Sequence, residues 1–348
     1  MVVVILPKPE TITGGQIFNE NVARILQKQG AELVYVKMGN TGTAKGLAEH
    51  IGATMVKIPL ILKKISKNQK VLYLSASGVA KNATILIHHS LRSWHKKEEC
   101  IGYTPSIKAR IKRIILEHLE EIAAKTSTKI IVPSITAKED ILKDYNVPKD
   151  KIAVVKQGVN KKLFRPLKTE PECGFFFVPN IFASPLKGAS LLLKAYEKAV
   201  DDGVETPLII TARVVPQWAK RILYKISPKS RSQIKIIDRL PRHKLPEYYW
   251  NARAVLYPSI YEGYGRVPLE AIASGAVVVT NNTVPVSNDI KEWAIITTPR
   301  VADWRDILVQ LENDAILRRT RTRAIAGSRK IPTWEDTARM IMFILEGA

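Results

Sequence analysis

Short apolar runs rich in β-branched residues recur along the chain and alternate with segments whose apolar residues follow helical spacing. Runs of this length predict buried parallel strands. They cover residues 2–6, 33–36, 71–74, 84–87, 129–132 and 152–155 in the first half, and 175–178, 208–211, 234–237, 254–256 and 277–280 in the second. Helical spacing predicts helices over 16–29, 106–124, 189–199, 245–251 and 333–345, and one opening at Ser134. This alternation in both halves predicts an α/β protein with two Rossmann-like, doubly wound domains.

One segment interrupts the alternation and is the expected linker between the domains. Residues 165–171 begin with Arg165-Pro166 and end at Pro171, and prolines between periodic segments indicate loops. We therefore expect a first domain over residues 1–166 and a second over residues 167–332. A length of 348 residues agrees with two domains of roughly 150 residues each.

The formal charge is the unusual part of the composition. The chain has a net charge of +22, and residues 1–165 hold about 28 Lys and Arg against about 13 Asp and Glu. Such an excess predicts an anionic partner, and a membrane surface, an acidic acceptor and a nucleic acid all fit it. The plainer alternative is a lysine-rich surface that serves solubility.

Other features of the sequence indicate a cytoplasmic protein. No apolar stretch approaches the roughly 20 residues of a membrane span, and the first residues lack the basic leader of a signal peptide. Cys100 and Cys173 lie far apart, without metal-ligand spacing, which fits a reducing compartment. No Asp-x-Asp pair indicates a metal site, so we expect no bound metal ion.

The segment 106–124 combines an apolar face with basic residues. The apolar residues of one helical face are Ile107, Ile111, Ile114, Ile115, Leu119 and Ile122, and the basic residues that lie largely off it are Lys108, Arg110, Lys112 and Arg113. A basic amphipathic helix of this kind can lie on an anionic membrane. The more ordinary interpretation is a helix that covers a sheet with its apolar side.

The segment 257–282 carries the strongest chemical signal. An apolar strand is followed by a loop with Glu262 and Gly265, then by Pro268, which is expected to be the first helical residue and to place Glu270 in the first turn. A helix start offers free N–H groups to a phosphate. Carboxylates beside such a site are unfavourable unless they bind something neutral, such as sugar hydroxyls. The segment therefore predicts a nucleotide-sugar pocket.

Two further patterns follow strands in the first half. Gly14-Gly15 stands between the first strand and its helix, in the place of a Rossmann glycine turn, but the three-glycine fingerprint of NAD binding is incomplete. An ordinary tight turn is the alternative. His88 and His89 end the strand at 84–87, and only one of the two can readily point to a ligand because strand side chains alternate. A core or surface histidine is the alternative for each.

These pieces, taken in order, resemble glycosyltransferase family 4, whose members are retaining enzymes of the GT-B fold. The specific part of the likeness is the pair Glu262 and Glu270 with seven residues between them. Weaker pieces extend the likeness over nearly the whole chain: Gly14-Gly15, 85–89, 130–134, 151–160, 164–166 and Trp334-Glu335. The resemblance implies two domains that face each other across a cleft. It also implies that the last helix, 333–348, packs back on the first domain.

The resemblance also implies roles for individual residues. Glu262 would contact hydroxyls of the donor sugar, and Glu270 would accept hydrogen bonds from the ribose. The sugar and diphosphate would be contacted by the loop of Gly263, Tyr264, Gly265 and Arg266. Lys187 would pair with the diphosphate and stabilise the charge of the leaving group. His88 or His89 would lie near the sugar and the acceptor, and His88 is preferred because it directly follows the apolar run.

One departure from the family pattern concerns the second cation on the diphosphate. The family usually has Gly-Arg after the first strand of the second domain, whereas this chain has Pro179-Asn180. With Asn180 in the place of the arginine, Arg266 or Arg213 is expected to supply the charge.

The expected function is transfer of a hexose, with retention, from a nucleoside-diphosphate sugar to an acceptor hydroxyl. The acceptor would be a glycan, a lipid-linked glycan or another anionic molecule held mainly by the first domain. We expect no metal ion and no cofactor besides the donor, and a cytoplasmic location peripheral to the membrane. The alternatives are a degenerate glycosyltransferase fold that serves as a binding or scaffold protein, and a glycosyltransferase that works on nucleic acid. No nucleic-acid motif supports the last.

Overall fold

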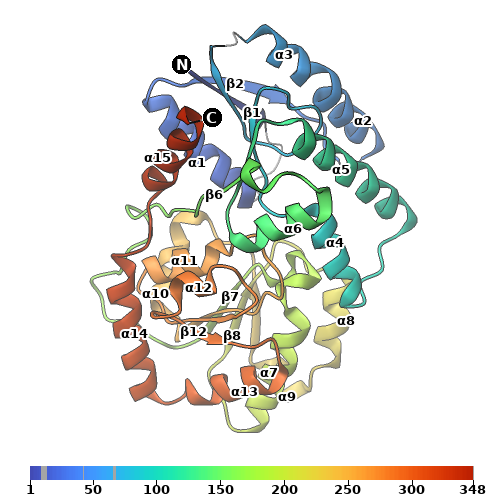
Figure 1. The fold of residues 1–348 in the computed structure, drawn as a ribbon. Helices are drawn as coiled ribbons and strands as arrows, with labels where there is room; N and C mark the ends of the chain where they lie inside the picture. Colours follow the sequence, from blue (N-terminus) through green and yellow to red (C-terminus); the bar gives the residue numbers. More distant parts are fainter. Residues whose placement is uncertain (9–13, 42, 66–67, 348) are drawn as a thin grey trace. The chain divides into compact units, whose positions relative to one another are not determined.

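The computed structural model describes residues 1–8, 14–41, 43–65 and 68–347. The chain divides into two compact units, each built on its own parallel sheet with helices packed around it (Figure 1). The first unit comprises Met1–Gly158 together with Pro332–Ala348, and the second comprises Val159–Ile331. The predicted fold class, two doubly wound α/β domains, is confirmed.

The first unit contains a six-stranded sheet in which all neighbouring strands are parallel. In spatial order the strands are β2 (Glu32–Lys37), β1 (Val2–Lys8), β3 (Lys70–Tyr73), β4 (Thr84–Leu86), β5 (Lys129–Val132) and β6 (Ile152–Val154). The chain goes from β1 to β2 on one side and returns to β3 on the other, so the strand order reverses between β1 and β3. In doubly wound sheets, ligands bind beyond the carboxyl ends of the strands at such a reversal.

Helices surround this sheet. They are α1 (Gly14–Lys28), α2 (Ala44–Gly52), the π-helical turn η1 (Ala53–Lys57), α3 (Ile58–Lys64), α4 (Leu91–Cys100), α5 (Ile107–Thr126), α6 (Ile135–Tyr145), the 3-10 turn η2 (Lys149–Lys151) and α15 (Trp334–Glu346). Serine N-caps explain where three of them begin, because Ser90, Ser106 and Ser134 each accept a hydrogen bond from the N–H three residues later.

The last helix, α15, belongs to the first unit although it follows the whole second unit in sequence. It begins with a capping box, in which Thr333 accepts a hydrogen bond from the N–H of Asp336 while the Asp336 carboxylate accepts one from the N–H of Thr333. The ring of Trp334 lies edge-on to that of Phe18 in α1, with the ring centroids 5.4 Å apart. Buried Ala338 and Ile341 continue this contact into the core.

The second unit also contains a six-stranded parallel sheet with one reversal of the strand order. Its parallel strands lie in the order β12 (Ile295–Thr297), β11 (Val278–Asn281), β10 (Ala254–Tyr257), β7 (Phe176–Pro179), β8 (Leu208–Thr211) and β9 (Ile234–Ile237). The chain proceeds outward from β7 to β9 and then restarts at β10 on the other side of β7. The strand order therefore reverses between β7 and β10.

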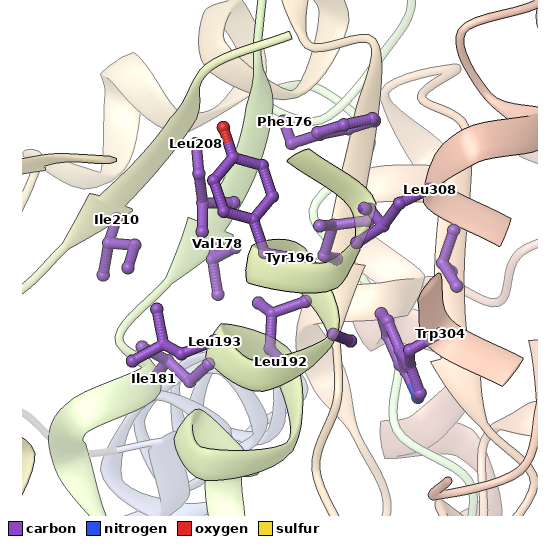
Figure 2. Packing of buried hydrophobic residues seen from close by; sticks show 14 of the residues in the cluster. Phe176, Val178, Ile181, Leu192, Leu193, Tyr196, Leu208, Ile210, Trp304 and Leu308 are labelled. Carbon is purple, nitrogen blue, oxygen red and sulfur yellow. The ribbon is translucent and has the colours of Figure 1, made fainter. Parts of the chain in front are cut away.

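The helices and helical turns of the second unit connect these strands. They are η3 (Ile181–Ala183), η4 (Pro185–Lys187), α7 (Ala189–Asp201), α8 (Gln217–Lys225), α9 (Pro228–Ser232), η5 (Arg242–Lys244), α10 (Leu245–Asn251), α11 (Arg266–Ala273), α12 (Ser287–Ile290), α13 (Val301–Gln310) and α14 (Asp314–Ser328). Figure 2 shows the core on one face of the sheet, where Leu192 and Tyr196 of α7 belong to the same cluster as Phe176 of β7 and Trp304 of α13. This packing supports the start of α7 at Ala189, which is separated from Lys187 by Gly188.

The border between the units falls before the expected linker. Val159 and Phe164 are buried in the core of the second unit with Tyr249, so the chain has already joined that unit by residue 159 and not at residue 167.

The positive charge is divided between the two units differently from the division between the predicted domains. The first unit carries 26 Lys and Arg against 16 Asp and Glu, and the second carries 28 against 16. The positive charge is therefore shared by both units and is not concentrated in the first.

Candidate functional site

The candidate site of the second unit lies at the carboxyl ends of β7 and β10, where the strand order reverses. Lys187 ends η4, the second short turn after β7, and Glu262 lies in the loop after β10. The two side chains form an ion pair, with Lys187 Nζ donating to Oε1 of Glu262. The contact joins the segments that follow β7 and β10. These strands are neighbours in the sheet but are separated by β8 and β9 in sequence.

The Glu262 carboxylate accepts two further hydrogen bonds on the same oxygen. The hydroxyl of Tyr257 donates from 2.7 Å and the hydroxyl of Ser259 from 2.9 Å. Only 12% of the Glu262 side chain is exposed. Burial alone would raise the pKa of this carboxyl, but the charge of Lys187 and the three donors outweigh burial and lower it. Glu262 is therefore held as a carboxylate. Burial of the Tyr257 side chain, together with the negative charge of Glu262, raises the pKa of Tyr257 well above its usual value.

Contacts with the main chain of Pro258 and Ser259 fix the loop that carries Glu262. The amide of Asn281, at the end of β11, donates to the carbonyl oxygens of Pro258 (2.8 Å) and Ser259 (2.9 Å), while its oxygen accepts from the indole N–H of Trp304. Gly188 lies so close to this loop that a β-carbon there would be 2.0 Å from the Pro258 oxygen, and its φ is +79°. Only glycine fits there without strain. These contacts bring Lys187 within reach of Glu262.

A second charged cluster surrounds Glu270 in α11. Its side chain is only 2% exposed, and its Oε1 lies 2.7 Å from Nη2 of Arg242 and 3.0 Å from Nε of Arg266. Because two guanidinium groups meet one carboxylate, the cluster has a formal charge of +1. Burial lowers the pKa of the Arg266 guanidinium, and the positive charge of Arg242 adds to that shift, while the carboxylate of Glu270 opposes it.

One buried polar group near this cluster has no partner. The hydroxyl of Tyr249 in α10 makes no hydrogen bond to any part of the chain that the structure describes. Burial raises the pKa of Tyr249 well above its usual range, and the negative charge of Glu270 adds to the shift. The group therefore stays a neutral phenol, which can donate or accept one hydrogen bond.

Helix α11 begins earlier than the sequence predicted. It starts at Arg266, with Gly265 as N-cap at a φ of +108°, so Pro268 is the third helical residue and Glu270 lies in the second turn. Pro268 is tolerated because the first four N–H groups of a helix have no partner within it. The prediction that Pro268 opens the helix is therefore wrong. Gly265 accepts no side-chain substitute, since a β-carbon there would lie 2.7 Å from Val284 Cγ1.

The loop residues differ in what they can offer a ligand. The side chain of Tyr264 is buried, and its hydroxyl donates to Asp289 of α12 at 2.9 Å. The side chain thus holds α12, and only the main chain of Tyr264 can contact a ligand. Asn180 lies at the end of β7 in a left-handed conformation, with its N–H directed to Thr211 O (3.0 Å) and Oγ1 (3.1 Å). Arg213 follows β8 and is exposed.

The predicted residues of the first unit also meet at carboxyl ends of strands. Gly15, after β1, lies against His88, after β4, and a β-carbon on Gly15 would be 2.8 Å from Cδ2 of the imidazole. The ring of His88 also contacts Phe18 edge-on, with centroids 5.3 Å apart. His89 instead contacts Trp94 of α4, with centroids 4.7 Å apart. The two histidines therefore point apart, and His88 is the one beside the glycine turn. Gly14 is the first residue of α1 and does not precede the helix.

Comparison with known proteins agrees with this geometry. Residues 160–330 match the model of the family described as glycosyl transferases group 1, which spans nearly the whole second unit. The chain is 23% identical over 292 residues to the O-antigen chain mannosyltransferase RfbU of Salmonella typhimurium, covering 78% of this chain and 80% of that protein. The chain is a glycosyltransferase.

Solved structures show the same architecture for this glycosyltransferase. WaaG, a glycosyltransferase involved in lipopolysaccharide biosynthesis, superimposes with a TM-score of 0.76 at 14% identity, covering 100% of both chains. Alr3699/HepE of Anabaena, solved with UDP and glucose, does so with a TM-score of 0.72 at 12% identity, again over 100% of both chains. The fold is therefore GT-B.

Several residues of the site were not found by sequence reasoning. Arg242 precedes α10 in sequence and carries no motif, and nothing in the sequence indicates that it reaches Glu270. Tyr257 and Ser259 belong to the segment already singled out, but their hydroxyls were not assigned a partner. A signal was available for Asn281, since it is a polar residue at the carboxyl end of a parallel strand.

The residues that the structure describes contain neither a metal site nor a membrane-spanning helix. No group of three or more His, Cys, Asp or Glu side chains lies close enough together to hold a metal ion, within the parts of the chain that the structure describes. Among the same residues, no helix is both long and apolar enough to cross a bilayer. The two cysteines, Cys100 and Cys173, are free thiols.

Proposed function

We propose that this glycosyltransferase transfers a hexose from a nucleoside-diphosphate sugar to an acceptor hydroxyl. The observation that supports this most is the meeting of Lys187 and Glu262 at the strand reversal of the second unit. A carboxylate held in its charged form is a strong acceptor for sugar hydroxyls, and an ammonium group beside it stabilises phosphate charge as the donor departs. On binding, the donor would take over part of the interaction that each side chain now makes with the other.

We propose that Glu270 binds the ribose of the donor and that Arg242 and Arg266 supply the second cation on the diphosphate. Asn180, which stands in the expected place of an arginine, is neutral. The surplus positive charge of the Glu270 cluster can replace that arginine, because a doubly charged diphosphate needs more than the single charge of Lys187. The positive end of the helix dipole at the start of α11 adds to this attraction.

We propose that transfer retains the anomeric configuration and needs no divalent ion. Both parts rest on the resemblance and on the cationic side chains, since Lys187, Arg242 and Arg266 can perform the charge stabilisation that a metal ion performs elsewhere. His88, beside Gly15 in the first unit, would lie near the sugar and the acceptor. The test is turnover in excess chelator and the anomeric signal of the product by NMR. Loss of activity in chelator would disprove metal independence, and an inverted product would disprove retention.

The acceptor is proposed to be a hydroxyl on a glycan or lipid-linked glycan that carries negative charge. The net charge of +22 supports an anionic acceptor, and both units contribute to it. RfbU, the relative named above, is an O-antigen chain mannosyltransferase, which makes a mannose donor the first to try. We also propose that the enzyme works in the cytoplasm, where free thiols such as Cys100 persist.

A further inference from the structure

Helix α14 and the segment 161–168 carry a large share of the positive charge. Residues 161–168 contain four Lys and Arg side chains, residues 315–330 contain six, and neither segment contains Asp or Glu. The two segments therefore hold ten of the 22 net positive charges of the chain. Charge of one sign that is concentrated in one place attracts a partner of the opposite sign more strongly than charge that is spread over the surface.

These two segments lie side by side in the second unit. The Nζ of Lys161 donates to the carbonyl oxygen of Arg329 at 2.8 Å. A β-carbon on Gly275, just after α11, would lie 3.1 Å from Ile325 Cγ1 and 3.2 Å from Pro166 Cγ, so both segments pack against that glycine. Their exposed cations therefore belong to one surface.

The exposed face of α14 carries its cations in two rows. A turn of 100° per residue places five exposed side chains on two flanks, with Arg318 and Arg329 on one and Arg319, Arg323 and Lys330 on the other. Each row is about 16 Å long, at 1.5 Å per residue. The exposed positions between the rows hold small side chains, those of Ala315, Thr322 and Ala326. An extended ligand can therefore approach the helix closely and meet cations on both sides.

Neighbouring carboxylates do not neutralise these cations. Within the parts of the chain that the structure describes, none of the five forms an ion pair, and neither do the exposed side chains of Lys162, Arg165 and Lys168. Asp314, the acidic residue that begins α14, is paired with Arg253. The carboxylates of the candidate site have their own cationic partners, as described above, and none of these eight side chains is among them.

We propose that this α14 surface, formed by the five cations of α14 with Lys162, Arg165 and Lys168, binds a linear anionic glycan. Charge complementarity supports an anionic partner, and two rows with small residues between them suit an extended chain better than a compact ligand. A bilayer fits less well, because no large apolar side chain that could enter it lies between the rows. A single-stranded nucleic acid fits less well, because no aromatic ring on which a base could stack lies there.

The choice of a glycan rests on the proposed glycosyl transfer, in which the acceptor is a glycan that carries negative charge. The α14 surface would hold a part of that chain away from the reacting hydroxyl. Binding at this surface needs neither the donor nor Glu262. It is therefore measured in the absence of any nucleotide sugar.

The test is the affinity of the full-length protein for fluorescein-labelled dextran sulfate, measured by fluorescence anisotropy at physiological salt. Unlabelled dextran sulfate should compete better than single-stranded DNA of the same total charge, and neutral dextran should not compete. Arg318→Gln/Arg319→Gln/Arg323→Gln should weaken the affinity about tenfold or more and make its dependence on salt shallower. Arg329→Gln/Lys330→Gln, at the other end of the rows, should also weaken it, because one chain contacts both ends.

Helix α8 supplies a matched control. Lys220, Arg221 and Lys225 are exposed and have the same spacing as the three arginines replaced together in α14. Lys220→Gln/Arg221→Gln/Lys225→Gln should keep the wild-type affinity within about threefold, because solvent screens charges that lie away from the bound chain. Far-UV circular dichroism verifies that each variant is folded.

Four outcomes would overturn the inference. The first two are an α14 triple variant that binds dextran sulfate like the wild type, and an α8 variant that loses as much affinity as the α14 variants. The others are stronger competition by DNA or by phosphatidylglycerol vesicles than by dextran sulfate. Thermal stabilisation by a nucleotide sugar should be the same in the α14 variants and the wild type. Its absence from the wild type would contradict the proposed function, whereas the anisotropy experiment decides the role of the α14 surface.

Discussion

Lys187 and Glu262 form an ion pair across the point where the strand order of the second unit reverses. The pair is largely buried, with 23% of the lysine side chain and 12% of the glutamate side chain exposed. Removing one partner of such a pair leaves an uncompensated charge, which costs more than removing both. The pair therefore serves the stability of the ligand-free protein and, in our proposal, the chemistry of the donor.

These two roles can be separated by replacing the residues singly and together. Lys187→Met should lower the free energy of unfolding by roughly 2–4 kcal/mol and transfer activity by about 100-fold or more. Lys187→Met/Glu262→Gln should regain most of the stability and none of the activity. Chemical denaturation and a transfer assay measure the two quantities. Equal loss of stability in the single and double variants would show that the pair is not coupled.

Arg242 and Arg266 are predicted to bind the diphosphate of the donor. Arg242→Gln and Arg266→Gln should each weaken binding of a nucleoside diphosphate about tenfold, the loss of one charge-assisted hydrogen bond, and leave binding of the free nucleoside nearly unchanged. Isothermal titration calorimetry measures both. Arg239→Gln, a neighbouring exposed arginine, is the control. If Arg213→Gln alone produces the effect, the second cation is Arg213, and equal loss of nucleoside affinity would place Arg242 at the ribose.

Because the Tyr249 hydroxyl has no partner in the described residues, Tyr249→Phe is predicted to have opposite effects on the stability of the free protein and on its affinity for a nucleotide sugar. Tyr249→Phe should leave the stability of the free protein unchanged or raise it by up to about 1 kcal/mol, because a buried polar group without a partner is removed. Nucleotide-sugar binding should weaken if the hydroxyl bonds to the donor. Thermal unfolding with and without nucleotide sugar measures both effects. A free protein destabilised by more than about 2 kcal/mol would contradict the assignment.

Glu120 in the first unit predicts a dependence of stability on pH. Burial raises the pKa of this carboxyl to about 8, and hydrogen bonds from Tyr145 and the N–H of Leu91 oppose the shift only in part. The folded protein thus keeps a proton that the unfolded chain releases above about pH 4.5. The free energy of unfolding should fall by up to about 1.4 kcal/mol per pH unit between about pH 5 and pH 8 from this group.

Replacing the titrating group tests the assignment. Glu120→Gln should flatten this part of the stability profile and raise the stability at pH 7.5, whereas Glu139→Gln on the exposed side of α6 should not. Urea denaturation at several pH values measures the profile. A slope that survives in Glu120→Gln would assign the effect to another group.

Much of the fold could be predicted from the sequence, because buried parallel strands leave a local signal. Strands β5, β8 and β9 have the predicted limits, since their β-branched runs end at polar or turn residues. The short strand β12 was not predicted, because Ile295–Thr297 is too short to stand out from its surroundings. The start of α11 was misplaced because proline is common at the first helical position, whereas here Gly265 supplies the cap.

The site could be predicted only in part, for a related reason. Glu262 and Glu270 lie within one continuous strand–loop–helix segment, so their spacing is visible in the sequence. Arg242 reaches Glu270 from another connection of the sheet, and Asn281 holds the Glu262 loop from a neighbouring strand. Such contacts depend on strand order, which a single sequence does not reveal. Ile107, at the start of α5, is 78% exposed although it belongs to the predicted apolar face, because a helical pattern shows such a face without showing what covers it.

The central claim is that the second unit binds a nucleoside-diphosphate sugar through Glu262 and Glu270. The most direct test is a thermal-shift panel of UDP-, GDP- and ADP-sugars, since a ligand present at 100 times its dissociation constant adds about 2.7 kcal/mol to the stability. We predict that sugars of one nucleotide stabilise the wild type and the exposed-site control Glu247→Gln, and that Glu262→Gln and Glu270→Gln lose the shift. No shift with any donor, or equal shifts in all four proteins, would contradict the account.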